Sequence, residues 1–142
     1  MDSFIIILTG IISALATFIL NNNLKQGGVR ASALLSLIVG IFFYLFPYLF
    51  NDYLTKNIPI VFIGASFIGM VSSKVISKYL LIVISGIIFS IIYFNTSSFF
   101  TGYGGALGTS ASISVLVSLS LAVVAKSKHV KKIRQLKRKN KN

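Results

Sequence analysis

Several residue types are missing or rare in this chain of 142 residues, and each absence excludes a class of function. There is no cysteine, so disulfides and thiolate metal sites cannot form. One histidine and two acidic residues are too few for a metal-ligand cluster or a nucleophile–base–orienter set. We therefore expect no metal, no cofactor and no enzymatic activity.

Charge is also scarce. Charged residues make up 11% of the chain, whereas a soluble domain carries roughly 25%. Hydrophobic residues make up 55%, and the mean hydropathy is +0.87. This composition predicts one all-α domain, a polytopic integral membrane helical bundle, rather than a protein with a water-soluble core.

Five apolar stretches without internal charge predict five transmembrane helices, because about 20 helical residues cross a bilayer. The third and fourth stretches are short, so a four-span arrangement, in which one of them only dips into the membrane, stays open. Pro59 falls at the start of the third stretch, where the first-turn amides are unpaired anyway. The predicted spans are residues 4–20, 31–50, 58–73, 79–94 and 105–125.

The basic residues predict how the chain crosses the membrane. Nine of the fourteen Lys and Arg residues lie in a polybasic tail, residues 126–142. If the tail is cytoplasmic, the outer side of a five-span protein holds only Lys56 among the bases, together with the two acids Asp2 and Asp52. The positive-inside tendency therefore places the N-terminus outside. Lys-, Asn- and Ile-rich composition makes the cytoplasmic membrane of a bacterium the expected location.

Two interfacial features accompany this topology. Tryptophan is absent, so tyrosines must anchor the interface, and Tyr44, Tyr48 and Tyr53 crowd the end of the second stretch like an aromatic belt. In the tail no aromatic residue is interleaved with the bases to stack on nucleotides, which disfavours nucleic acid and favours anionic lipid headgroups. The predicted headgroup-binding residues are Lys131, Lys132, Arg134, Lys137 and Arg138.

Small residues recur at spacings of four within the spans, as in Gly10/Ala14, Ala65/Gly69 and Gly86/Ser90. Such faces let helices pack closely. Because they occur on every span, we expect self-association or a membrane protein partner.

Two glycine pairs precede spans that carry a small polar stripe. Gly27-Gly28 introduces the stripe Ser32, Ser36, Gly40, and Gly104-Gly105 introduces the stripe Ser110, Ser114, Ser118. The two spans run in opposite directions in the predicted topology. This arrangement is typical of an inverted repeat that relates helices 1-2 to helices 4-5, with the third span as linker.

In such folds, helix starts at the repeat interface present free amides to an anion. The pattern therefore predicts an oligomeric channel or permease for a small anion or neutral polar solute. A carboxylate-coupled transporter is disfavoured, because no span contains an ionisable residue. The predicted ligand path is Gly27, Gly28, Arg30, Ser32, Ser36, Gly104, Gly105, Thr109, Ser110 and Ser114.

Plainer interpretations of the same residues stay open. Glycine and serine also serve simply to bring helices together, and Arg30 also serves as a topology charge. Small size, uncharged spans and a basic tail fit a second function, that of a non-transporting accessory subunit or assembly scaffold of a larger membrane complex.

Overall fold

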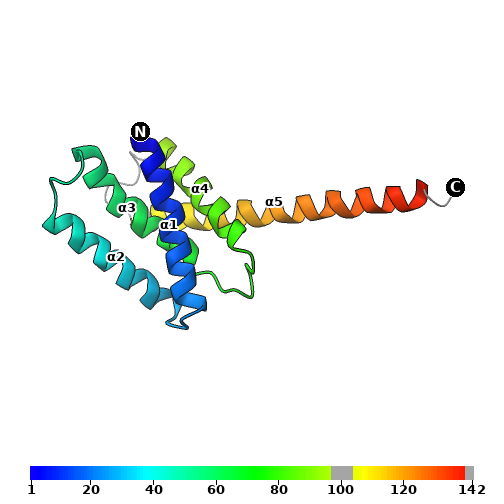
Figure 1. Cartoon of the computed structure of the whole chain (residues 1–142), viewed down its shortest axis with the longest axis horizontal. Coiled ribbons are helices and arrows are strands. Elements are labelled where there is room, and N and C mark those ends of the chain that lie inside the picture. The colour runs from blue at the N-terminus through cyan, green and yellow to red at the C-terminus, as the bar shows by residue number, and fades with distance from the viewer. Residues whose placement is uncertain (97–103, 140–142) are drawn as a thin grey trace.

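The computed structural model describes residues 1–96 and 104–139, with side chains described as far as Ser127. The described residues are helical, without any strand, and Figure 1 shows a bundle from which the last helix projects. This part of the chain forms the helices α1 (Asp2–Asn22), α2 (Gly28–Leu45), α3 (Asp52–Gly69), α4 (Tyr79–Thr96) and α5 (Gly104–Lys139).

Four of these helices are long and apolar enough to cross a membrane: α1, α2, α4 and the Gly104–Ser127 part of α5. They indicate a membrane protein and confirm the predicted all-α class for the described residues. The sequence of α3 is more polar, because its first two turns contain Asp52, Lys56 and Asn57.

The prediction that Pro59 lies in the first turn of its helix is wrong. α3 begins at Asp52, so Pro59 is inside the helix. The cause is an N-cap: Asn51 Oδ1 accepts a hydrogen bond from the amide of Leu54 at 2.8 Å. The second predicted span, residues 31–50, is too long at its end, because α2 ends at Leu45, two residues before Pro47.

α3 lies at the centre of the bundle and contacts each of the other four helices. Nine of its 18 residues are buried. α1 runs beside it in the same direction over its whole length. At one end Asn51 Nδ2 donates to Asp2 Oδ2 at 2.9 Å, and at the other Asn21 Nδ2 donates to the Met70 carbonyl at 2.9 Å.

α4 runs in the opposite direction to α1 and α3. At its start, the Tyr79 ring packs edge-on against Phe18 near the end of α1, with ring centroids 5.7 Å apart. Near its end, the Tyr93 hydroxyl donates to Asn57 Oδ1 in the second turn of α3 at 2.5 Å. α2 is antiparallel to α3 as well, because its first residue, Gly28, lies against Met70 at the end of α3.

The small-residue faces predicted on α1, α3 and α4 are the places where these helices approach most closely. A Cβ atom on Gly69 would lie 2.5 Å from Thr17 Cβ and 2.6 Å from the Ala14 carbonyl oxygen of α1. A Cβ atom on Gly86 of α4 would lie 3.1 Å from the Gly10 carbonyl oxygen of α1. Helix backbones can come this close only where the side chains are absent or small.

α5 crosses the bundle obliquely. Leu107 of α5 and Phe89 of α4 both lie against Gly64 of α3. Eleven residues further along α5, Ser118 pairs with Ser85, which is four residues before Phe89 in α4. At about 1.5 Å per residue, the contact point therefore moves about 16 Å along α5 but only about 6 Å along α4. Figure 1 shows its second half leaving the bundle.

Candidate functional site

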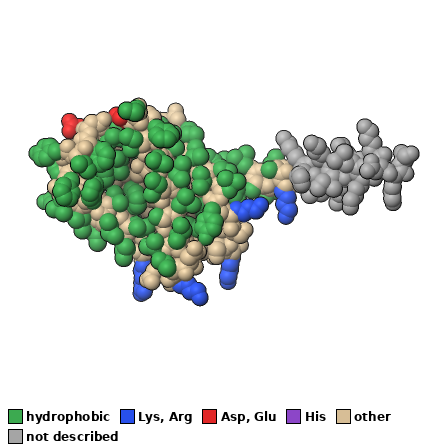
Figure 2. All heavy atoms as spheres, viewed as in Figure 1, with side chains coloured by type: hydrophobic (Ala, Val, Ile, Leu, Met, Phe, Trp, Pro, Cys, Tyr) green, Lys and Arg blue, Asp and Glu red, His purple; other side chains and the backbone are tan. Residues whose placement is uncertain are grey.

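Charged side chains gather at two opposite ends of the bundle, as Figure 2 shows. Asp2 and Asp52 lie where α1 and α3 begin. The end where α1 and α3 finish carries four exposed bases, which form no ion pair within the part of the chain that the structure describes. These bases are Lys25, Arg30, Lys74 and Lys78.

Lys25 lies in the loop after α1, Lys74 and Lys78 lie in the loop after α3, and Arg30 lies in the first turn of α2. An asparagine of α1 fixes the loop after α3. The last carbonyls of a helix have no partner within the helix. At the end of α3, Asn21 Nδ2 lies 3.3 Å from the Gly69 carbonyl oxygen, 2.9 Å from that of Met70 and 3.4 Å from that of Val71. The Asn21 side chain thus caps α3 from the neighbouring helix.

The next two asparagines extend this contact. Asn22 Nδ2 donates to the Val71 carbonyl at 3.1 Å, and Asn22 Oδ1 accepts from the Ser73 amide at 2.7 Å. Asn23 Nδ2 donates to the Tyr79 hydroxyl at 3.2 Å. We call Asn21, Asn22 and Asn23 the asparagine clamp, because they join the end of α1 to the loop after α3 and to the first residue of α4.

The predicted polar stripe of α2 has buried hydroxyls at its two serines and open space at Gly40. Ser32 is 4% exposed, and its Oγ lies 2.6 Å from Ser66 Oγ of α3. The Ser36 hydroxyl is buried and has no partner among the described residues. A Cβ atom on Gly40 would meet nothing within 4 Å.

The stripe of α5 faces α4 instead. Ser118 Oγ lies 2.7 Å from Ser85 Oγ, and the fully buried Ser114 donates to the Ser110 carbonyl at 2.7 Å. Thr109 is exposed and donates to the carbonyl of Ala106 at 2.9 Å. The serine hydroxyls of both stripes are therefore mostly engaged in joining helices or in bonds to their own helix.

The two glycine pairs have different surroundings. Gly27 is the N-cap of α2 with φ +83°, and a Cβ atom on Gly28 would lie 3.1 Å from Met70 Cβ. Gly104 and Gly105 are exposed, and a Cβ on either would meet nothing within 4 Å.

The predicted path residues thus form two groups that rest on different partners. α2 packs on α1 and α3, whereas α5 packs on α3 and α4. The first group is Gly27, Gly28, Arg30, Ser32 and Ser36, at the start of α2; the second is Gly104, Gly105, Thr109, Ser110 and Ser114, at the start of α5.

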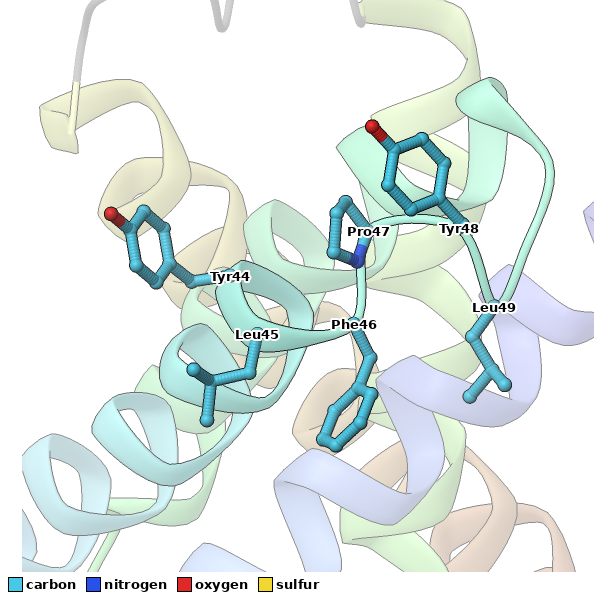
Figure 3. Close-up of a pocket in the computed structure, with 6 residues that line it drawn as sticks. All are labelled: Tyr44, Leu45, Phe46, Pro47, Tyr48 and Leu49. Atoms are coloured by element: carbon cyan, nitrogen blue, oxygen red, sulfur yellow. The ribbon is translucent and has the colours of Figure 1, made fainter.

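A shallow pocket lies beyond the end of α2, in the predicted aromatic belt. Its lining residues are Tyr44, Leu45, Phe46, Pro47, Tyr48 and Leu49. Figure 3 shows the Tyr44 and Tyr48 hydroxyls pointing to the same side of the loop, away from Phe46. The two tyrosines are 84% and 98% exposed, so they line an open surface rather than an enclosed site.

Sequence reasoning missed the asparagine clamp, although three consecutive asparagines directly after an apolar stretch were a visible signal. The predicted headgroup-binding residues Lys131, Lys132, Arg134, Lys137 and Arg138 lie in the helical part of the tail, but their side chains are outside the described ones. Comparisons with protein-family models, with curated proteins and with solved structures find no match for this chain.

Proposed function

We propose that this chain is a non-transporting accessory subunit or assembly scaffold that holds a basic helix at the cytoplasmic face of a bacterial membrane. One observation carries the proposal: α5 is a single helix of 36 residues. Its first turns are packed into the bundle through Leu107, Ala111 and Ser114, and its last turns contain most of the basic residues of the chain. A helix of this length extends about 54 Å.

The helix has no obvious hinge where it leaves the bundle. No glycine or proline occurs between Thr109 and Lys139, and these are the residues that most often kink a helix. The direction of the basic segment is therefore set by the packing of its first half. A transporting protein has no need of such a rigid arm, whereas a scaffold that presents a basic surface to a partner does.

The proposed topology has five spans, with the N-terminus outside. It is supported by the side-by-side course of α1 and α3, since a helix of 18 residues that is tied at both ends to a spanning helix of 21 residues crosses the same layer. The polar residues of α3, Asp52, Lys56 and Asn57, then lie at the outer interface. Thirteen of the fourteen bases fall on the cytoplasmic side in this arrangement.

A second candidate is the oligomeric channel or permease for a small anion or neutral polar solute. Two features favour it: the open space at Gly40 and the open glycines at the start of α5. These groups are not used within one chain, so a path would run between copies of the protein. The proposed inverted repeat has weaker support, because the serine pairs join α2 to α3 but α5 to α4.

Purification from native membranes in mild detergent separates the two candidates. The scaffold predicts an unrelated protein in stoichiometric amount, which is lost when Lys131, Lys132, Arg134, Lys137 and Arg138 are all changed to Gln and retained when the lysines are changed to Arg. A pure self-oligomer that conducts halide or a polyol in proteoliposomes would contradict the scaffold. Gly105→Leu, at an open position, should then stop the flux without unfolding the protein.

A further inference from the structure

We propose that the end of the bundle held together by the asparagine clamp is a basic platform that binds the phosphates of anionic phospholipid headgroups. The platform consists of Lys25, Arg30, Lys74 and Lys78. It is separate from the polybasic tail and lies at the opposite end of the bundle from the acidic residues (Figure 2). The two acidic residues of the sequence, Asp2 and Asp52, lie where α1 and α3 begin, so the charge of these bases is available to an external anion.

The clamp gives this surface a fixed geometry. Asn22 donates to the Val71 carbonyl and accepts from the Ser73 amide, which immediately precedes Lys74. Asn23 bonds to Tyr79, which immediately follows Lys78. Four bases on segments that moved independently would lose conformational entropy each time they gathered around a phosphate. Segments that are already joined lose less, which favours binding.

The backbone of the loop after α1 also has a defined conformation. Lys25 has φ +52°, in the left-handed region that glycine or asparagine normally occupies. Such a conformation at a lysine costs free energy and persists only where the surroundings impose it. The chain reverses here between α1 and α2, and Gly28 then lies against Met70, at the start of the loop that carries Lys74 and Lys78.

The neighbours of the bases identify a lipid surface rather than a soluble partner. Each of three bases is followed or preceded by an exposed aliphatic residue: Leu24 is 60% exposed, Val29 74% and Val75 61%. Alternating bases and aliphatic side chains suit the boundary between headgroups and acyl chains, where the aliphatic groups enter the hydrocarbon and the cations meet phosphate. A nucleic acid or an acidic protein would leave these aliphatic side chains in water.

This inference rests on the proposed topology, which puts the platform at a bilayer surface, but its test does not. The full-length protein in a neutral detergent is titrated with phosphatidylglycerol or phosphatidylcholine, and bound lipids are counted by native mass spectrometry. We expect at least tenfold tighter binding of phosphatidylglycerol. Changing Lys25, Arg30, Lys74 and Lys78 to Gln should remove most of this preference, whereas changing the five predicted tail residues to Gln should leave a clear part of it.

Two further variants keep the test decisive. Asn22→Ala keeps every charge but releases the loop after α3, and we expect it to weaken phosphatidylglycerol binding several-fold while circular dichroism still shows a folded helical protein. Changing the three platform lysines to Arg should keep the preference. Equal binding of both lipids by the unaltered protein, or an undiminished preference in the folded platform variant, would overturn the proposal. Neither result depends on a protein partner or on solute flux, so this failure is distinguishable from failure of the proposed function.

Discussion

α2 and α3 have the same length, but the more apolar of the two helices is the less buried one. α2 is apolar enough to cross a membrane by itself, yet only two of its 18 residues are buried. α3 begins with polar and charged residues, yet half of it is buried. In a membrane bundle, large apolar side chains therefore mark a helix face that contacts lipid, while small residues mark a face that contacts other helices.

Particular side chains account for the difference. α3 carries Gly64, Ala65, Ser66 and Gly69 at its contacts, so its neighbours approach the backbone. α2 turns large side chains outward, among them Leu34, Leu37 and Ile41, which are 53%, 64% and 49% exposed. We expect lipid acyl chains to cover this face.

The largest difference in stability is expected when one methyl group is added to a glycine of α3 or of α2. Gly69→Ala would press a Cβ atom against backbone atoms of Ala14 and Phe18 that lie 2.6 Å away and cannot move independently. We expect a loss of about 3 kcal/mol of stability, the upper part of the range for overpacked cores. Gly40→Ala, the matched control in open space, should change stability by less than about 1 kcal/mol. Unfolding in mixed micelles, followed by circular dichroism, measures both; equal losses would contradict the comparison.

A pair of large-to-small substitutions should give the next largest difference. Ile68 of α3 is fully buried, so Ile68→Ala leaves a cavity and should cost about 2 kcal/mol. Leu37 of α2 is 64% exposed, and Leu37→Ala should cost less than about 0.5 kcal/mol. The same unfolding assay applies, and a larger loss at Leu37 would mean that α2 has a protein neighbour rather than lipid.

Gly27, the N-cap of α2, and Gly104, the first residue of α5, are expected to differ in the same assay. Gly27 has φ +83° and ψ +144°, a combination that is close to glycine-only, so Gly27→Ala should cost about 1–2 kcal/mol. Gly104 has no such φ and open space around it, so Gly104→Ala should be neutral or slightly stabilising. A cost at Gly104 as large as that at Gly27 would restore the symmetry of the two glycine pairs.

The smallest effect concerns the hydroxyl pair that joins the two compared helices. Ser32 and Ser66 are 2.6 Å apart, and a double-mutant cycle with Ser32→Ala and Ser66→Ala should give a coupling of about 0.6 kcal/mol. The same cycle for Ser85 and Ser118, which are 2.7 Å apart, should give a similar value. Zero coupling in the first pair alone would show that α2 is held by apolar contacts only.

Local patterns in the sequence predicted the helices and their close-packing faces well, because glycine at a spacing of four acts wherever two helices meet. The limits of α3 were harder to predict, since the polar residues before Pro59 look like a loop until Asn51 is known to cap a helix there. The oblique course of α5 and the separate partners of the two serine stripes were not predictable. Which helix a serine stripe faces depends on how all five helices pack, because the stripe itself does not specify its neighbour.

We propose that α3 crosses the membrane beside α1 despite its polar first turns, and the absence of cysteine makes a direct measurement possible. Single cysteines replace the exposed Lys56 near the start of α3 and the exposed Lys74 just after its end. We expect a membrane-impermeant maleimide to label Lys56→Cys in intact cells, and Lys74→Cys only after the cells are opened. Labelling of both cysteines from the same side would contradict it.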